Sequence, residues 1–571
     1  MSTEAAEIAK RLVEIGQRLA LAGESPYKAR AYMRAAESLL TLTIPLSEVI
    51  AQGRLQEIPG VGAAIGANIQ ELHRSGTTGK LDRLRADTPE SVLEMLRIPG
   101  LGPEKVAQIH KRLGIASLAD LEEACRSDRI KNAKGLGPSV QTRVLQGLDI
   151  MRHSRGQRLI HHAADLLEGA AANLKRSHPE LRKIALAGDF RRGCELVSNL
   201  AIVAEVPEGR GTHLAELNGE IPLWLADRRR YGSALLLATG SAEHLAQVKA
   251  AAEDRGFVLG EDGLYRGKRL AACETEEQLY SKLGFAFVPP ELREAGDELE
   301  LAATGRLPRL IAPEDLRGLL HCHTDFSDGG NTLEEMAAET RARGYRYFGV
   351  ADHSRSATYA GGLSLEQIEE QHALADALNR RYRGKFRIFK GIESDILVDG
   401  SLDYPEDILA SFDFVVASVH SHFRLDRKAQ TERILRAVSN PYASILGHMT
   451  GRMLMRRPGY EIDIDRVLRA CADHAVAVEI NANPHRLDLD WRWHRRAVEL
   501  GCLLSINPDA HSIDELDLTH WGVLMARKGA VPAERVLNAR EPDAVARWFE
   551  GRREPGGSQS RRRSLPPRRR G

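Results

Sequence analysis

Cysteine is scarce and unpaired in this sequence. The six cysteines stand at positions 125, 194, 273, 322, 471 and 502, and no two of them form a CxxC pair. This spacing argues against a disulfide framework and a zinc ribbon, and it favours a reducing compartment. No apolar run reaches the length of a membrane span. The acidic residues of the first amphipathic segment, MSTEAAEIAKRLVEI, distinguish it from a signal peptide. We therefore expect a cytoplasmic protein with no membrane partner.

The sequence also lacks an excess of charge of either sign. Its 80 lysines and arginines balance 79 aspartates and glutamates, which leaves a formal net charge of +1. The chain as a whole is no polycation, so any nucleic-acid site must come from local segregation of charge. At 571 residues the chain is too long for one core, and domain sizes favour roughly three to five units.

Three related glycine segments follow a helical N-terminal region. They read IPGVGAAIGANI from residue 58, IPGLGPEKVAQI from residue 98 and AKGLGPSVQTRV from residue 133. The glycines permit turns with positive φ and let the N–H groups of a helix N-terminus face a phosphate. Each segment resembles the helix-hairpin-helix motif, which binds DNA backbones without reading sequence. Repetition strengthens the prediction, and the candidate DNA-binding residues are Gly60, Gly62, Gly100, Gly102, Gly135 and Gly137.

The region from 150 to 310 has a mixed pattern. A helix is expected from Arg158 to Lys175, followed by strands that begin at Ile184 and Leu200. The run that starts at Leu235, LLLATGSAEHLAQVKAAAEDRG, is interpreted as a strand, a turn and a helix. These elements predict an α+β region distinct from the helical N-terminus.

Seven short β-like runs occupy residues 316 to about 530, and most are followed by a helical stretch. They begin at residues 319, 347, 387, 414, 444, 477 and 503. Strands that alternate with helices predict parallel βα units. A parallel barrel gathers the carboxyl ends of its strands at one rim, and in each of these runs the polar residues cluster at that end.

Histidines and carboxylates lie at those strand ends. The set consists of His321, His323, Asp328, His353, Glu393, His420, His448, Asp509 and His511. The alternation of a strand points His321 and His323 to one face and Cys322 to the other. Imidazoles and carboxylates are the usual ligands of Zn, Mn and Fe. Nine ligands exceed the needs of one ion, so we expect two or three divalent ions with Glu393 as a bridge.

Clustered divalent ions suit the hydrolysis of phosphate esters, because they neutralise phosphate oxygens, activate water and stabilise the leaving alkoxide. We expect Glu393, His321, His323 and Asp509 to carry the catalysis. Five further residues near the same rim are expected either to contact substrate or to form local hydrogen bonds. They are His422, Asn481, Asn483, His485 and Arg486.

The barrel region resembles the polymerase-and-histidinol-phosphatase (PHP) family. The resemblance rests on the runs HCHTDFSDG, ADHS, GIESDI, SVHSHF, GHMTGR, EINANPHRLDL and PDAH. It implies a distorted seven-stranded barrel with a trinuclear metal site. All nine ligand positions of the family are filled here. Manganese is the expected functional ion, with zinc or iron as alternatives.

The complete chain resembles a bacterial family X DNA polymerase with a C-terminal PHP domain. The glycine segments, GDFRRG, ALLLATGS and VPPELRE come in the order of that family. The resemblance implies a helix-hairpin-helix region at 1–85, a fingers-like region at 86–150, an α+β nucleotidyltransferase-like palm at 151–235, a thumb at 236–312, the α/β barrel at 313–552 and a tail at 553–571. The Pro-, Gly-, Ser- and Arg-rich segment PGGSQSRRRSLPPRRRG, which begins at residue 555 and holds six arginines, predicts a disordered basic tail. Arg191 and Arg192 are added to the expected DNA contacts.

The palm departs from the family where its metal ions bind. Asn199 and Ala201 occupy the positions of the two adjacent aspartates, and Pro222 occupies that of the third. Asp189 replaces a serine that contacts the triphosphate. Asn and Ala are poor metal ligands, and an added carboxylate would repel a triphosphate. Asp227 lies five residues from the third position and would require a shifted strand. We expect nucleotide transfer to be lost.

The first glycine segment also lacks the lysine of a lyase. Family members with deoxyribose-phosphate lyase activity form a Schiff base through a lysine in the helix that follows this turn. Ala64 and Asn68 stand where lysines are expected. Lys28 and Lys80 are nearby, and phosphate contact is their usual role. Lyase activity is therefore expected to be absent.

The leading hypothesis is a DNA-repair enzyme: a metal-dependent 3′→5′ exonuclease, or 3′-end-processing phosphodiesterase. It would be a monomer near the bacterial nucleoid that acts on gapped, nicked or damaged DNA. One alternative is an active gap-filling polymerase, whose synthesis would survive His321→Ala. A second alternative is a non-catalytic DNA-binding scaffold, which would contain no metal.

Overall fold

The computed structural model describes residues 3–40, 46–207, 211–217 and 221–553. It divides into two compact units, one made of residues 1–155 with 455–457 and the other of residues 156–454 with 458–571. The basic tail expected at 553–571 lies, after residue 553, outside the described ranges. Among the described helices, none has both the length and the apolar character that a membrane crossing requires.

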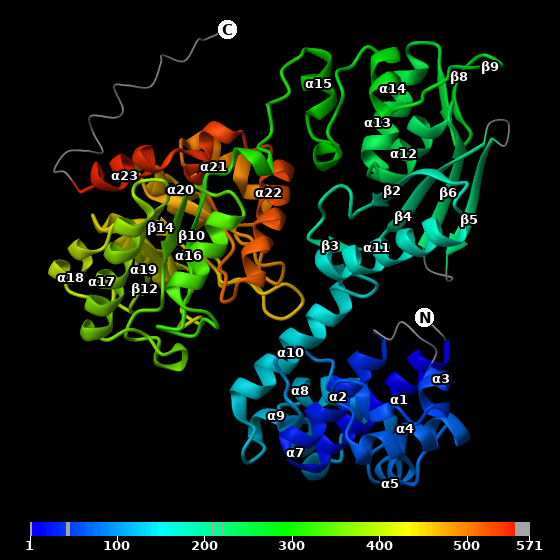
Figure 1. The fold of residues 1–571 in the computed structure, drawn as a ribbon, viewed down its shortest axis with the longest axis vertical. Coiled ribbons are helices and arrows are strands. Elements are labelled where there is room, and N and C mark those ends of the chain that lie inside the picture. The colour runs from blue at the N-terminus through cyan, green and yellow to red at the C-terminus, as the bar shows by residue number, and fades with distance from the viewer. Residues whose placement is uncertain (1–2, 41–45, 208–210, 218–220, 554–571) are drawn as a thin grey trace. The chain divides into compact units, whose positions relative to one another are not determined.

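The first unit is helical throughout its described residues (Figure 1). Its elements are α1 (Thr3–Ala22), α2 (Pro26–Leu40), α3 (Leu46–Ala51), η1 (Leu55–Glu57), α4 (Ala63–Ser75), α5 (Gly79–Asp87), α6 (Glu90–Met95), α7 (Pro103–Leu113), α8 (Leu118–Arg126), α9 (Arg129–Asn132) and α10 (Gly137–His153). Leu12 and Ile15 of α1 are fully buried, in one apolar core with residues of α2 and α4. A second core holds residues of α6 to α10. The first glycine segment therefore packs into the first core, and the second and third segments share the other core.

The glycine segments adopt the turns that their sequence predicts. Gly60, Gly100 and Gly135 have left-handed backbones, with φ of 80°, 75° and 86°. Gly62 and Gly102 are extended and precede α4 and α7 as their N-caps. The third segment differs, because its second glycine has φ of 78° and is itself the first residue of α10. Two of the three segments thus share one geometry.

The second unit begins with a palm-like sheet and a smaller helical and β region. The first elements are β1 (Arg158–Leu159), α11 (Ile160–Ser177), β2 (Arg182–Gly188), β3 (Leu196–Val197), β4 (Leu200–Val206), β5 (Thr212–Leu217) and β6 (Ile221–Asp227). The sheet order is β2-β4-β6-β5. The next elements are α12 (Tyr231–Thr239), α13 (Ala242–Glu253), β7 (Val258–Gly260), β8 (Gly263–Arg266), β9 (Arg269–Leu270), α14 (Glu276–Lys282), η2 (Pro290–Leu292) and α15 (Glu298–Ala303).

One predicted strand in this region is wrong. The apolar run at Leu235 belongs to helix α12, which ends at Thr239 and is followed by α13. Residues from Tyr231 to Leu236 are all buried. A short run that is apolar on every side carries no periodicity, so it does not distinguish a buried strand from a buried helix.

The rest of the second unit is a nearly closed parallel barrel, as predicted. Its strands are β10 (Gly318–Cys322), β11 (Tyr347–Val350), β12 (Arg387–Asp395), β13 (Phe414–Ser418), β14 (Ala443–Leu446), β15 (Ala477–Asn481) and β16 (Leu504–Asn507), in that spatial order. A bridge between Cys322 and Ala510 joins the first strand to the segment after the last. The surrounding elements are η3 (Pro313–Asp315), α16 (Leu333–Ala342), η4 (Thr358–Ala360), α17 (Leu365–Tyr382), α18 (Glu406–Ser411), α19 (Arg427–Ser439), α20 (Ile464–Asp473), η5 (Trp491–Trp493), α21 (His494–Leu500), η6 (Asp514–Leu518), α22 (Thr519–Lys528), η7 (Ala533–Arg535), η8 (Leu537–Ala539) and α23 (Pro542–Glu550).

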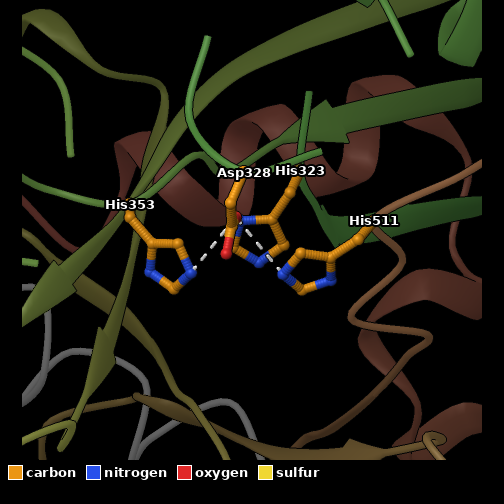
Figure 2. A group of neighbouring side chains, drawn as sticks. All are labelled: His323, Asp328, His353 and His511. Atoms are coloured by element: carbon orange, nitrogen blue, oxygen red, sulfur yellow. Dashed lines mark ion pairs between the residues drawn. The ribbon is translucent and has the colours of Figure 1, made fainter. Parts of the chain in front are cut away.

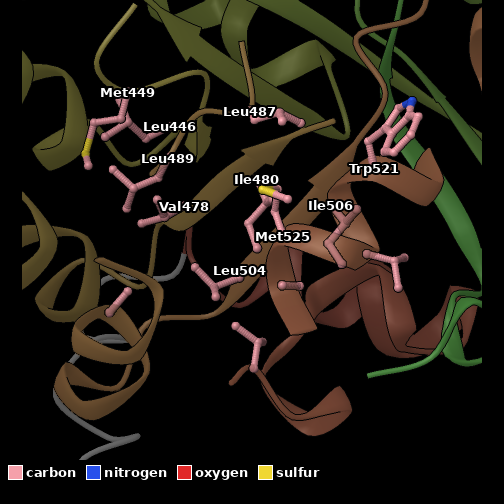
Figure 3. Packing of buried hydrophobic residues seen from close by; sticks show 14 of the residues in the cluster. Leu446, Met449, Val478, Ile480, Leu487, Leu489, Leu504, Ile506, Trp521 and Met525 are labelled. Carbon is pink, nitrogen blue, oxygen red and sulfur yellow. The ribbon is translucent and has the colours of Figure 1, made fainter. Parts of the chain in front are cut away.

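Apolar side chains cover both faces of the barrel strands, as is usual for parallel sheets. Figure 3 shows Ile480 and Ile506 of neighbouring strands close to Met525 of α22, within one buried cluster. At the end where the strands begin, the ring of Phe549 from α23 stacks on that of Phe414, the first residue of β13, at 5.2 Å. Helix α23 therefore covers the end of the barrel where the strands begin. Because the strands are parallel, their carboxyl ends all lie at the opposite end.

Within the second unit, the palm-like part contacts the barrel. The indole Nε1 of Trp491 donates a hydrogen bond to Glu195 at 2.9 Å. The ammonium of Lys528 donates to the carbonyl of Arg192 at 3.0 Å and to Glu294 at 2.5 Å. Trp491 follows β15 and Lys528 ends α22, so the palm supports two segments on the same side of the barrel.

Candidate metal centre

The nine predicted ligands come together at the carboxyl ends of the barrel strands. Their donor atoms form four overlapping groups, each with all atoms within 4.8 Å of one another. The groups are His323, Asp328, His353 and His511; His321, His323 and Glu393; His321, His448 and Asp509; and His353, Glu393 and His420. His321 and Asp509 have positive φ of 62° and 53°. Such backbone strain in non-glycine residues is typical of functional sites.

Glu393 lies at the middle of the cluster and is almost completely buried. Its Oε1 is 3.2 Å from Nε2 of His321, 3.3 Å from Nε2 of His420 and 3.0 Å from Nε2 of His448. Its Oε2 is 2.9 Å from Nδ1 of His353. One carboxylate thus faces imidazoles on both of its oxygens, which is the arrangement that a carboxylate bridging two ions requires.

Asp328 gathers a second set of histidines on the outer side of the cluster. Figure 2 shows it between His353 and His511, whose Nε2 atoms lie 3.6 Å and 3.4 Å from its Oδ1. The ring of His323 stacks on that of His511 with centroids 4.1 Å apart. The Asp328 side chain is 37% exposed, whereas His323 is fully buried. The centre therefore opens to solvent on this side.

Several of these donor atoms are buried close to an oppositely charged neighbour but make no hydrogen bond of suitable geometry. They include Nε2 of His321, Nδ1 of His323, Nδ1 of His353 and Oε2 of Glu393. A buried polar atom left unsatisfied costs about 1–3 kcal/mol, and here such atoms are concentrated in one place. Imidazole and carboxylate donors suit divalent Zn, Mn and Fe. The residues present therefore fit a cluster of divalent ions.

The charges of the cluster shift its histidines in opposite directions. Burial alone would lower the pKa of His321, but the carboxylates of Glu479 and Glu393 outweigh it and raise that pKa well above its usual value. Burial, together with the neighbouring imidazole of His353, lowers the pKa of His323 to about 3. A neutral imidazole offers a free lone pair, so His323 is held in the form that binds metal.

Two carboxylates behind the ligands were not singled out from the sequence. Oε1 of Glu479 lies 2.6 Å from Nδ1 of His321, and its Oε2 accepts the backbone N–H of His448 at 2.7 Å. Oδ1 of Asp395 lies 2.6 Å from Nδ1 of His420. Carboxylates in this position fix the orientation of an imidazole ligand and raise its basicity. Glu479 lies in the run EINAN and Asp395 in the run GIESDI. In these runs the sequence predicted a role only for the two asparagines and for Glu393.

Asp352 holds the loop that carries Asp328. It is fully buried and accepts hydrogen bonds from the backbone N–H of Thr324 at 2.7 Å, from the hydroxyl of Ser327 at 2.5 Å and from the amide of Gln371 at 2.7 Å. Burial raises the pKa of Asp352, and these hydrogen bonds oppose the rise. The carboxylate before His353 thus has a structural role.

The asparagine and arginine expected near substrate differ in what they contact. Asn481 is fully buried, and its amide donates to Oδ2 of Asp509 at 3.0 Å, so it orients a ligand. Arg486 is partly exposed, with Nε 3.7 Å from the same oxygen. Its guanidinium is therefore placed beside the cluster, where it can meet an anionic substrate.

The other three candidates lie farther out in loops. The side-chain oxygen of Asn483 accepts the backbone N–H of His485 at 3.0 Å, which is a local turn. The ring of His485 meets that of His161 from α11 at 4.9 Å. His422 is exposed in the turn after β13, with φ of 54°. These contacts give Asn483 and His485 structural roles in the described chain.

The loop before β4, where the palm aspartates were expected, is held by the side chain of Asp189. The carboxylate of Asp189 accepts the backbone N–H groups of Ser198 and Asn199 at 2.9 Å and 2.8 Å. It also pairs with Arg192 at 2.8 Å. Asn199 is exposed just before β4, and Ala201 is buried within that strand. The charge of Asp189 is thus compensated inside the protein.

Strand register places Pro222 beside Ala201. β4 and β6 are parallel, with Ile202 paired to Leu223, so the preceding residues are neighbours. Asp227 pairs with Val206 at the other end of β6 and forms a buried ion pair with Arg230 at 2.6 Å. Five residues along a strand span roughly 16 Å. Asp227 therefore does not lie at the position expected for the third aspartate.

Both palm arginines have acidic partners within the chain. Arg191 pairs with buried Glu276 at 2.6 Å, and Glu276 also pairs with Arg293 at 2.5 Å. Arg192 pairs with Glu294 at 3.0 Å. The guanidiniums expected to contact DNA thus already have charged partners.

In the first unit, the lyase positions are also occupied by other contacts. The amide of Asn68 donates to the hydroxyl of Tyr32 at 3.3 Å and to the carbonyl of Ala64 at 2.6 Å. Lys80 donates to the same hydroxyl at 3.0 Å, and Lys28 pairs with Glu24 at 3.0 Å. The lysine nearest to Asn68 is therefore engaged with a tyrosine.

Comparison with known families covers most of the chain. Residues 4–78 match the helix-hairpin-helix domain, and residues 92–149 match the SAM-like helix-hairpin-helix tandem. Residues 234–294 match the DNA polymerase beta thumb, and residues 320–483 match the PHP domain. The expected ligands Asp509 and His511 lie beyond the PHP match, in the segment that follows β16, the last strand of the same barrel.

Known relatives match either nearly the whole chain or about two fifths of it. The chain is 32% identical over 560 residues to the DNA polymerase/3′-5′ exonuclease PolX of Bacillus subtilis (strain 168), which covers 94% of this chain and 97% of the relative. It is 27% identical over 259 residues to a probable phosphatase of Caldanaerobacter subterraneus subsp. tengcongensis, which covers 43% of this chain and 96% of that protein. A probable phosphatase of Edwardsiella ictaluri is 29% identical over 246 residues, which is 41% of this chain and 95% of the relative. The chain therefore belongs to family X of the DNA polymerases, in the form that carries a C-terminal PHP domain.

Proposed function

We propose that this protein is a divalent-metal-dependent 3′→5′ DNA exonuclease that processes the 3′ ends of gapped, nicked or damaged DNA. The observation that carries the proposal is the convergence of eight histidine and aspartate side chains around Glu393. The PolX relative along nearly the whole length and the probable phosphatases along the barrel support hydrolysis of phosphate esters.

The four ligand groups would hold two or three divalent ions, with manganese as the proposed native metal. Such ions supply charge neutralisation for phosphate oxygens and activate water near neutral pH. Among the protein's own residues, Glu393, His321, His323 and Asp509 form the buried floor of the centre. Arg486 adds a cation beside Asp509 for a phosphate group.

The N-terminal unit would hold the DNA. The N-termini of α4 and α7 follow glycine turns of the same geometry, and a helix N-terminus offers unpaired N–H groups to a phosphate. Contacts of this kind fix the position of a duplex without reading its sequence. We therefore propose sequence-independent DNA binding by a monomer, in the bacterial nucleoid.

Nucleotide transfer is proposed to be lost. The three positions of the palm aspartates hold Asn199, Ala201 and Pro222, of which only the first has a side-chain oxygen. The arginines expected to contact DNA are paired with buried or partly buried glutamates. The lyase activity is proposed to be lost as well, because Asn68 replaces the amine that a Schiff base requires.

The test uses gapped DNA labelled either at the 3′ or at the 5′ end of the primer strand, with Mn²⁺. We expect release of labelled mononucleotide from the 3′ end and stepwise shortening of the 5′-labelled strand, both lost in His321→Ala. Intact 3′-labelled DNA, together with hydrolysis of a small phosphomonoester by the same preparation, would contradict the proposal and indicate a phosphatase.

A further inference from the structure

Tyr359 is a strongly exposed aromatic residue beside the metal ligands. It is 71% exposed, more than the other exposed large hydrophobic residues of the barrel, Leu365 and Val398. Its ring centroid lies 6.1 Å from that of His353 and 6.5 Å from that of His420. A singly exposed apolar residue is common on protein surfaces and assigns nothing by itself. The position of this ring, against two imidazoles of the metal centre, is what calls for an explanation.

The segment that carries Tyr359 is a tightly bonded turn. It begins after β11 and contains η4, and its end returns to its start, because the N–H of Leu363 donates to the carbonyl of His353 at 2.9 Å. A Cβ atom at Gly362 would lie 1.9 Å from the carbonyl oxygen of Ser354, so only glycine fits this close approach. The flanking alanines of the turn are buried. A ring presented from a rigid turn loses little conformational entropy when a ligand covers it.

The surroundings of the ring define the ligand that suits it. The cluster of carboxylates and imidazoles fits phosphate chemistry, whereas the Tyr359 ring is apolar and open. A nucleotide has both parts, a phosphate for the metal centre and a planar base for an aromatic surface. Stacking of a base on an aromatic ring tolerates any sequence, because every base has a π-face. That property matches DNA binding through backbone contacts.

We propose that Tyr359 forms a subsite for the nucleobase at the 3′ terminus of the DNA strand, whose phosphodiester is held at the metal centre. The inference rests on the proposed exonuclease function and specifies how the enzyme holds the base of the terminal nucleotide. The phosphate is bound by the cluster, and the base of the terminal nucleotide stacks on the ring beside His353 and His420. The residue contacts substrate through its ring and not through its hydroxyl.

The experiment compares two single-stranded oligonucleotides that differ only at the 3′ end, one with a normal nucleotide and one with an abasic residue. The value of kcat/KM for release of the terminal residue is measured for the wild type, Tyr359→Ala and Tyr359→Phe. Leu365→Ala serves as the matched control, since Leu365 is exposed in the same domain. Bound metal is measured for each variant to show that the centre is intact.

We expect the wild type to prefer the base-bearing end by about 5- to 150-fold, the range of base–aromatic stacking. Tyr359→Ala should bring the ratio of the two rates close to one, and Tyr359→Phe should restore it. An unchanged ratio in Tyr359→Ala, or an equal loss in the alanine and phenylalanine variants, overturns the subsite. Failure of the proposed function is distinguishable, because the wild type would then release no nucleotide from either oligonucleotide.

Discussion

Glu479 gives the sharpest test of how the metal centre is built. This buried carboxylate lies 2.6 Å from Nδ1 of His321 and accepts the backbone N–H of His448 at 2.7 Å. The substitution Glu479→Gln keeps the shape of the side chain and removes its charge. Because the carboxylate holds the imidazole with Nε2 toward Glu393, we expect weaker metal binding. Removal of such supporting carboxylates costs roughly 10- to 100-fold in metal affinity or activity, which corresponds to about 1.4–2.7 kcal/mol.

The assay is a Mn²⁺ titration of metal-free protein by calorimetry, followed by the rate of DNA hydrolysis at each metal concentration. The matched control is Glu432→Gln, because Glu432 is a half-exposed glutamate on α19 that pairs with Arg466 at 2.7 Å. We expect the control to match the wild type and the loss in Glu479→Gln to be recovered at high Mn²⁺. Wild-type affinity in Glu479→Gln would refute the reasoning. Asp395→Asn, 2.6 Å from Nδ1 of His420, provides a second reading of the same kind.

Three further outcomes follow from the described contacts. Glu276→Gln leaves buried Arg293 without its carboxylate, and we expect about 3–5 kcal/mol lower stability in urea unfolding. Burial alone would raise the pKa of Glu276, but the guanidiniums of Arg293 and Arg191 outweigh it and lower the pKa below its usual 4.5. The stabilisation by this carboxylate is therefore complete above about pH 4.5 and is lost as the pH falls through the folded-state pKa. Unfolding midpoints should show this pH dependence in the wild type and not in the variant. Chelation of the metal should lower the thermal midpoint of the wild type, by linkage of about 2.7 kcal/mol at a metal concentration of 100 Kd, and scanning fluorimetry should find a much smaller shift in Glu393→Ala. The double variant Asn199→Asp, Ala201→Asp should still incorporate no nucleotide in a gap-filling assay, because the third aspartate position is a proline; incorporation would contradict the account of the palm.

The barrel and its expected ligands could be predicted from the sequence because a polar residue marks the end of each strand. Six of the seven apolar runs end in histidines or carboxylates and the seventh ends in asparagines, and parallel closure alone brings those ends to one rim. The nine residues named from sequence therefore lie in the four groups that the structure shows. The supporting carboxylates Glu479 and Asp395 were missed because their role depends on which imidazole nitrogen faces them. The orientation of each imidazole ring is known only when the positions of the strands in the folded barrel are known.

The palm contains contacts between residues far apart in the sequence, which a sequence pattern does not predict. The residues at the expected aspartate positions could be named from the sequence, but the ion pair of Arg191 with Glu276, 85 residues later, could not. The strand expected at Leu235 is the helix α12, because a run buried on every side has no period that favours one element. The left-handed turns at Gly60 and Gly100, by contrast, follow from local sequence alone.

The central claim is that the barrel is the active site for DNA and the palm is not. The most direct measurement incubates a 5′-labelled primer on gapped DNA with Mn²⁺, Mg²⁺ and all four dNTPs, for the wild type and Glu393→Ala. We expect the wild type to shorten the primer and Glu393→Ala to leave the length of the primer unchanged. Extension of the primer that survives in Glu393→Ala would contradict it.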